Sequence, residues 1–214
     1  MPRTGPWNVA PRLAAMAVVA LLHLLAYLAV TRVNAGRPEH VLWDLTTPVD
    51  AAIPHLPFTW PLYWLVYFFV PLAGAIALLR MSEPAFRRAI VAYSGMLLVG
   101  AGVQLLIPAR APWPASPAPI QELYHTSGLV LPYANLPSMH VAFATLTAAM
   151  LATVVLSRGW RLAATSAALL ITVGTLTLKE HFVLDAVAGV LLALATWRWW
   201  HASGKGRPVR GEAG

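Results

Sequence analysis

The chain has 214 residues, of which 58% are hydrophobic and only 11% are charged. A soluble domain usually carries about 25% charged residues, whereas here the charges separate apolar runs close to the roughly 20 residues that span a bilayer. This composition excludes an ordinary soluble domain, a disordered chain and a coiled coil. It favours a polytopic membrane protein with one helical domain.

Cysteine content and net charge narrow the possible functions. The chain contains no cysteine, which excludes disulfides, thiolate metal sites and a thiol nucleophile. A formal charge of +7 would suggest a nucleic-acid partner in a soluble protein, but in a membrane protein it reflects basic cytoplasmic loops. We therefore expect no nucleic-acid partner. The abundance of Arg, Ala and Leu is compatible with a bacterial source.

Six apolar segments are long enough to be membrane spans, and all should be helical because lipid-exposed backbone must satisfy its own hydrogen bonds. They cover residues 13–33, 60–79, 89–107, 137–156, 162–178 and 182–200. The first could instead be a signal peptide, but its apolar stretch of about 21 residues exceeds the usual 7–15. We expect an all-α membrane domain of six helices over residues 1–202, with its catalytic core at about 86–200. Residues 203–214 should form a flexible, basic cytoplasmic tail.

The positive charges indicate how the helices are oriented. With the N-terminus inside, eleven of the fifteen Lys and Arg residues fall on the cytoplasmic side. Both termini are therefore predicted to be cytoplasmic, in a bacterial inner membrane. The same orientation places two long segments, 34–59 and 108–136, on the outer, extracytoplasmic side of the membrane. They could cover a site there, because long loops often carry function.

Side chains suited to phosphate chemistry gather on this outer side. The fourth predicted helix begins near Pro137, since proline is favoured at the first helical position, and it carries His140 in its first turn. The sixth opens with His181 and Asp185, which are four residues apart and so share a helix face. A carboxylate on one imidazole nitrogen leaves the other nitrogen free to attack. His140 could then donate a proton to a leaving oxygen.

The same end of these helices favours an anion. Helix N-termini present free amides and the positive end of the helix dipole, which together bind phosphate. Arg110 and Lys179 add positive charge, and Ser138 adds a hydroxyl. Each of these residues alone has an ordinary explanation, such as an interfacial arginine. Their coincidence on one face favours a functional site, because ionisable residues near membrane spans are usually functional.

Two motifs carry a resemblance to a known family. The run LPSMH at 136–140, followed about forty residues later by HFVLDAVAG at 181–189, resembles the type 2 phosphatidic acid phosphatase superfamily. Met139 stands where many members have glycine, which is similar to the branch that includes inositol phosphorylceramide synthases. The stretch DAAIPHLP at 50–57, together with Tyr63 and Tyr67, is more loosely similar to that branch.

The resemblance implies a role for each catalytic candidate. His181 would be the nucleophile that forms a phosphohistidine, and Asp185 would orient it. His140 would protonate the leaving group and later activate water or an alcohol. Ser138 and nearby amides would hold phosphate oxygens, and no metal or other cofactor is implied. The candidate substrate-binding residues are Arg110, Lys179, Ser138, Met139 and Asn135.

Two positions depart from the family's pattern. Arg110 matches the arginine of the first phosphate-binding motif, but Val103 stands where that motif has a lysine. Thr175 stands where the third motif has an arginine, six residues before His181. Lys179 could replace one of these two cations.

Three functions are compatible with the sequence. A lipid phosphatase would hydrolyse a lipid phosphate or diphosphate, whereas a phosphotransferase would move a phosphoryl-headgroup from a phospholipid to the hydroxyl of another lipid. The third is a non-enzymatic transporter or channel with a His/Asp relay. The candidate residues lie at one rim rather than along a path through the bilayer, which favours the two enzymes. The sequence leaves open the lipid, the acceptor and assembly into a homo-oligomer.

Overall fold

The computed structural model describes residues 9–114, 117, 122–123, 126, 132–133, 135–155 and 157–204. The long helices are α1 (Val9–Ala35), α3 (Trp60–Arg80), α4 (Glu83–Leu106), α6 (Met139–Val154), α7 (Arg158–Thr177) and α8 (Val183–Ala202). A short helix, α2 (Pro48–Ala52), and the 3-10 turns η2 (Glu39–Val41) and η3 (Pro57–Thr59) lie between α1 and α3. The predicted all-α architecture is confirmed for these residues. Most of the predicted tail, 205–214, lies outside them.

Five of the helices, α1, α3, α4, α7 and α8, are long and apolar enough to cross a membrane. The remaining long helix, α6, is apolar but has only 16 residues. With a rise of 1.5 Å per residue it covers about 24 Å, less than the roughly 30 Å hydrocarbon core. It begins two residues after the predicted start at Pro137, because Ser138 is the capping residue and accepts a hydrogen bond from the Val141 amide.

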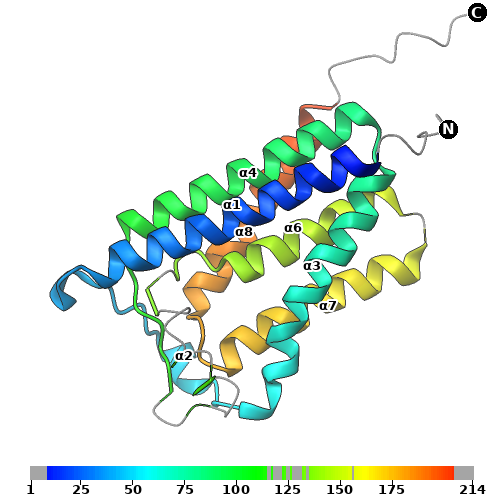
Figure 1. Ribbon diagram of the computed structural model, residues 1–214. Coiled ribbons are helices and arrows are strands. Elements are labelled where there is room, and N and C mark those ends of the chain that lie inside the picture. Colours follow the sequence, from blue (N-terminus) through cyan, green and yellow to red (C-terminus); the bar gives the residue numbers. More distant parts are fainter. Residues whose placement is uncertain are drawn as a thin grey trace, which may run out of the picture.

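Helix α6 lies at the centre of the bundle. It packs against α3, α7 and α8, while α4 packs against α8 and α1 (Figure 1). These neighbours bury most of its side chains, including Leu146 and Met150, which are fully buried. The hydrophobic core is therefore built around α6, and a residue at its first turn is held by three other helices.

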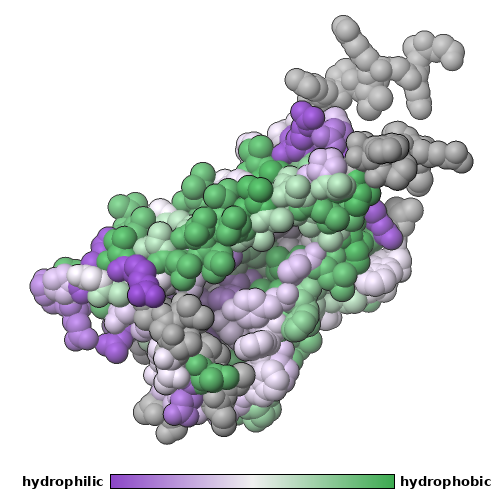
Figure 2. Space-filling view, viewed as in Figure 1, coloured by the Kyte–Doolittle hydropathy of each residue, from purple (hydrophilic) through white to green (hydrophobic). Residues whose placement is uncertain are grey.

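The outer sides of the helices are apolar. Leu21 of α1, Leu98 of α4 and Leu191 of α8 are all exposed. Figure 2 shows hydrophobic residues along the length of the visible side and hydrophilic residues gathered toward its ends. Contiguous apolar surface on this scale is foreign to a soluble monomer, and together with the apolar helices it indicates a membrane protein.

Polar side chains fasten α1 to the bundle near both of its ends. The buried guanidinium of Arg12 donates to the carbonyl of Met81 at 2.8 Å and to the carboxylate of Glu83 at 3.1 Å. Near the other end, the side-chain amide of Asn34 donates to the carbonyl of Gln104 at 2.9 Å. The first predicted span is therefore packed as an integral helix of the bundle.

One end of the bundle, here called the site end, collects the starts of α3, α6 and α8 and the ends of α1, α4 and α7 (Figure 1). The segments 36–59 and 107–114 also lie there. They are joined to each other because the amide of Trp43 donates to the carbonyl of Pro108 at 2.8 Å. The described parts of the two long segments predicted from the sequence therefore lie near the first turns of α6 and α8, whereas most of 115–134 lies outside the described residues.

Candidate active site

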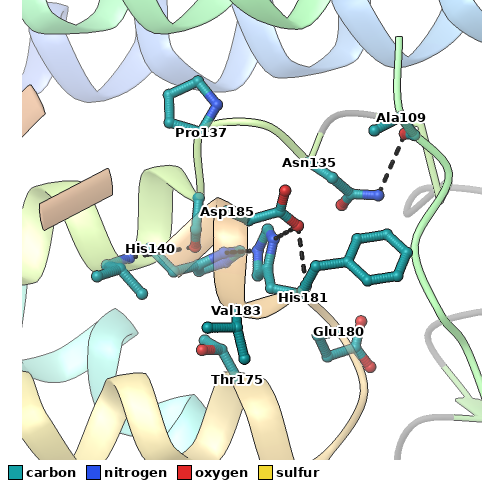
Figure 3. A network of polar contacts seen from close by, with 12 residues as sticks. Ala109, Asn135, Pro137, His140, Thr175, Glu180, His181, Val183 and Asp185 are labelled. Carbon is teal, nitrogen blue, oxygen red and sulfur yellow. Dashed lines mark hydrogen bonds and ion pairs between the residues drawn. The ribbon is translucent and has the colours of Figure 1, made fainter. Parts of the chain in front are cut away.

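His140 and His181 meet at the site end (Figure 3). Nδ1 of His140 lies 3.3 Å from Nε2 of His181, and the two ring centroids are 5.6 Å apart. His140 is the second residue of α6, and His181 lies two residues before α8. The first turn of α6 and the turn that enters α8 thus bring together imidazoles that are separated by forty residues of chain.

Asp185 supports His181 on the side away from His140. Its Oδ2 accepts hydrogen bonds from Nδ1 of His181 at 3.3 Å and from the amide of Phe182 at 2.9 Å. The carboxylate is fully buried. It places the proton of His181 on Nδ1, which leaves a lone pair on Nε2. Because His181 precedes α8, the contact arises from the turn that enters the helix and not, as expected, from a shared helix face.

The distance between α6 and α8 is set by a close backbone approach. The amide of Ser138 donates to the carbonyl of Asp185 at 2.9 Å. One turn further along α8, a Cβ on Gly189 would lie 2.5 Å from the carbonyl oxygen of Ser138. Only glycine leaves room for this contact, because real Cβ atoms do not approach a backbone oxygen so closely. Gly189 therefore holds the two histidine-bearing segments together.

Two tyrosine hydroxyls lie at the other nitrogen of His140. Its Nε2 is 3.2 Å from the hydroxyl of Tyr63 and 3.3 Å from that of Tyr67. These tyrosines are four residues apart on α3 and so share one face of that helix. From sequence they entered only as part of a loose resemblance, although their spacing predicts a common target.

The amides at the start of α8 are bonded to carboxylates of the chain itself. Oδ1 of Asp50, in α2, accepts a hydrogen bond from the Val183 amide at 2.7 Å, and Asp185 accepts from the Phe182 amide. A helix N-terminus favours negative charge, which explains why two carboxylates gather there. These two amides are therefore not free to bind a phosphate. This corrects the expectation from the sequence that the start of this helix offers free amides to an anion. The first turn of α6 has no acidic residue, and its Val141 amide is bonded to the hydroxyl of Ser138.

Lys179 is bonded to the segment that carries α2. Its ammonium group donates to the carbonyls of Asp50 at 2.7 Å and Ile53 at 2.6 Å. Its backbone has a φ of 59°, a left-handed conformation that is uncommon outside glycine and that turns the chain from α7 toward His181. An ammonium group has three donors, so at most one is left for a substrate. The contacts show Lys179 as a clamp that fastens α2 over the site.

Two of the remaining predicted substrate-binding residues are bonded to other parts of the chain. The guanidinium of Arg110 is exposed and forms an ion pair with Glu39 at 3.3 Å. The side-chain amide of Asn135 donates to the carbonyl of Ala109 at 3.2 Å (Figure 3). Arg110 is therefore held at the surface, and Asn135 connects the loop before α6 to the segment after α4.

Ser138 and Met139 have structural contacts of their own. Ser138 is fully buried, and its hydroxyl caps α6. The side chain of Met139 is directed toward α4, where its sulfur lies against Gly100. The structure thus brings together the three catalytic candidates and Ser138, whereas the side chains of Arg110, Asn135 and Met139 contact other parts of the chain.

A cavity of about 310 Å³ opens beside His181. Its walls are Thr46, Asp50, Ala51, His55, Pro112, Pro114, Lys179 and His181. Both long outer segments contribute to it, as a cover over the site would. Nε2 of His55 is buried there and has no hydrogen-bond partner within the described part of the chain. His55 and Asp50 were not among the residues predicted from sequence to form the site.

The carboxyl group of Asp50 is held in its ionised form. Burial alone would raise its pKa, but hydrogen bonds from Thr47 and from the amide of Val183, together with the charge of Lys179, outweigh this effect. The pKa of Asp50 is therefore lower than its ordinary value. A lowered pKa means that ionised Asp50 stabilises the folded state above the ordinary carboxyl pKa of about 4. This stabilisation disappears as the pH falls through the lower, folded-state value.

We expect Asp50→Asn to destabilise the protein by about 2 kcal/mol at pH 7, because hydrogen bonds to a charged group are lost. Thermal unfolding in detergent micelles should show this difference from the parent shrinking as the pH is lowered toward 3. Asp44→Asn is the control, since Asp44 is exposed and accepts its hydrogen bonds from the nearby Thr46. If Asp50→Asn were less stable than the parent by the same amount at pH 7 and at pH 3, this account would be contradicted.

Comparison with known proteins agrees with the geometry. The sequence profile of the PAP2 superfamily matches residues 51–199, which is most of the chain and includes His140, His181 and Asp185. No curated protein sequence and no solved structure matches the chain.

Proposed function

Because the chain belongs to the PAP2 superfamily, whose members are generally phosphoric ester hydrolases, we propose that it is a membrane-embedded lipid phosphatase. Its substrate would be a lipid phosphate or diphosphate, hydrolysed through a phosphohistidine without a metal. The observation that carries this proposal is the line of contacts from Asp185 through His181 to His140. It joins a carboxylate-backed nucleophile to a second imidazole that can move a proton.

In the first step, Nε2 of His181 attacks phosphorus. A P–N bond forms, the bond to the leaving oxygen breaks, and protonated His140 gives its Nδ1 proton to that oxygen. The leaving oxygen lies on the far side of phosphorus from the attacking nitrogen. The phosphoryl group therefore enters between the two nitrogens that lie 3.3 Å apart in this structure, and the rings separate as it binds.

In the second step, His140 acts as a base. Its Nδ1, now carrying a lone pair, takes a proton from water while the water oxygen attacks phosphorus. The P–N bond breaks, phosphate leaves, and the lone pair on Nε2 of His181 is restored. Both imidazoles thus end the cycle in the protonation states with which they began it.

We place the site at the extracytoplasmic face of a bacterial inner membrane, with α6 as a sixth span and both termini in the cytoplasm. The support comes from the end of the bundle opposite the site. Basic residues gather there at the end of α3 and at the starts of α4 and α7: Arg80, Arg87, Arg88, Arg158 and Arg161. Positive charge of this kind marks the cytoplasmic side.

A phosphotransferase similar to inositol phosphorylceramide synthases is the second candidate. The cavity of about 310 Å³ beside His181 is far larger than a phosphate group and reaches the size of small-ligand sites. It has room for a headgroup, or for an alcohol that takes the place of water. A transporter is less well supported, because the relay residues lie at one end of the helices and not along a path through the bundle.

The test of the proposed function is product identification with the full chain in right-side-out membrane vesicles. A short-chain, ³²P-labelled phosphatidate is added from outside, and we expect free phosphate without permeabilisation, together with an acid-labile phosphoenzyme. A labelled phosphodiester lipid would instead identify the phosphotransferase. Activity that requires permeabilised vesicles would overturn the proposed orientation. Turnover of the parent protein without any phosphohistidine would overturn the mechanism.

A further inference from the structure

The imidazole of His140 is contacted at both nitrogens. Nδ1 faces His181, and Nε2 lies 3.2 Å from the hydroxyl of Tyr63 and 3.3 Å from that of Tyr67. The rings of both tyrosines also lie against the imidazole, with centroids 4.9 and 6.0 Å from its own. One face of α3 therefore surrounds the far side of His140.

The backbone places Tyr63 in this position. A Cβ on Gly174 of α7 would lie 2.5 Å from the backbone nitrogen of Tyr63, so glycine is needed for α3 and α7 to approach there. Tyr63 is only 4% exposed as a result. Tyr67, one turn further along α3, is 54% exposed on the outer side of the bundle. Its hydroxyl nonetheless reaches His140.

We propose that Tyr63 and Tyr67 are positioning residues that control which nitrogen of His140 carries the transferable proton. This inference rests on the proposed function of His140 as acid and base. The two hydroxyls accept a hydrogen bond from Nε2–H, so the proton that moves to and from substrate is the one on Nδ1. The tyrosine pair thus fixes the position of the proton on His140, as Asp185 fixes it on His181.

A hydroxyl suits this task because it accepts a hydrogen bond without adding the negative charge of a carboxylate. In both states of the proposed cycle, the imidazolium and the neutral ring with its proton on Nε2, the hydroxyls accept from Nε2–H. The contact therefore persists through every state of the cycle, and the ring is held in one orientation.

The difference between the two partners also assigns the two roles. A carboxylate stabilises an adjacent imidazolium more strongly than a neutral hydroxyl does, because charge-assisted hydrogen bonds are about twice as strong as neutral ones. His181, backed by Asp185, is therefore the better electron donor toward phosphorus. His140, backed by two neutral hydroxyls, gives up its proton more readily. The chain thus distinguishes nucleophile from acid by what lies behind each ring.

The test compares substrates that do and do not need an acid. Tyr63→Phe, Tyr67→Phe and the double variant are assayed for first-turnover release of the leaving group from phosphatidate and from a lipid aryl phosphate. An aryloxide leaves without protonation, whereas the alcohol of phosphatidate requires it. We expect the double variant to lose about 10- to 100-fold on phosphatidate but less than threefold on the aryl ester. Equal losses on both substrates, or none on either, would overturn the proposal.

Tyr93→Phe is the matched control. The hydroxyl of Tyr93 is also buried among the helices, but it is bonded to Thr147 and has no contact with His140. Its loss should affect both substrates equally or not at all. A selective loss on phosphatidate in Tyr93→Phe would show that the substrate preference does not depend on the contact with His140, and it would also overturn the proposal.

A second measurement does not depend on activity. In protein labelled with ¹⁵N-histidine, the signals of His140 are identified by their absence in His140→Gln. We expect their nitrogen shifts to change in the double tyrosine variant and to stay unchanged in Tyr93→Phe. Unchanged His140 shifts in the double variant would overturn the proposal. Absence of phosphatase activity in the parent would overturn the proposed function, while this measurement would still report on the tyrosine contact.

Discussion

Replacing His181 by alanine should lower the turnover of a lipid phosphate by about four to six orders of magnitude. Under the proposed mechanism, the variant loses the nitrogen that Asp185 prepares for attack, and no phosphoenzyme can form at this position. His140→Ala should cause a loss of similar size on alkyl esters. The double variant should lose little more than either single one, because residues that act as a unit have non-additive effects.

His201→Asn is the control for the His181 variant. His201 lies at the opposite end of α8 and is exposed, so its loss should leave turnover unchanged. Initial rates of phosphate release, measured with the purified proteins at equal concentration, provide the comparison. Wild-type turnover in His181→Ala would exclude the proposed nucleophile. Thermal unfolding of each variant confirms that any loss is not due to unfolding.

Gly189→Ala should cost about 100-fold in turnover and also lower the melting temperature. The new Cβ would lie 2.5 Å from the carbonyl oxygen of Ser138, so α8 must shift away from the start of α6. Overpacking of this kind costs about 1–3 kcal/mol. A displacement of reacting groups by about 1 Å can cost 100-fold in rate, and this shift would separate His140 from His181 and Asp185.

Gly95→Ala provides the matched control for Gly189→Ala. Gly95 also lies within a long helix, α4, but a Cβ there would meet nothing within 4 Å. Alanine favours helix over glycine by about 1 kcal/mol, so this variant should unfold at the same or a higher temperature with unchanged turnover. Equal behaviour of the two variants in both assays would show that the approach of α8 to Ser138 does not govern the site.

Most of the helical architecture could be predicted from the pattern of residues along the chain. Apolar runs of about 20 residues predict membrane helices wherever they occur, because lipid leaves the backbone no other way to satisfy its hydrogen bonds. The predicted helix bounds differ from the observed ones by six residues at most, at the start of α4, which was predicted at 89 and lies at Glu83. The start of α6 lies two residues later than predicted, because a capping serine follows the proline.

The catalytic candidates were equally accessible from sequence, but their surroundings were not. His140, His181 and Asp185 stand in short motifs whose chemistry depends on residue type. Lys179, in contrast, was predicted to bind phosphate on the strength of its charge, and the fold directs its ammonium group to the carbonyls of Asp50 and Ile53. Charge shows what a side chain could bind, whereas packing determines what it reaches first.

Residue pattern thus sufficed for the kind of protein, for the long helices among the described residues and for the candidate reactive groups, since all three depend on neighbours within a few positions of the chain. Helix packing was needed to bring Tyr63 and Tyr67 to His140 and to occupy the start of α8 with Asp50. These contacts join residues that lie more than seventy positions apart. They depend on how closely whole helices approach, which glycines such as Gly174 and Gly189 permit only in the assembled bundle.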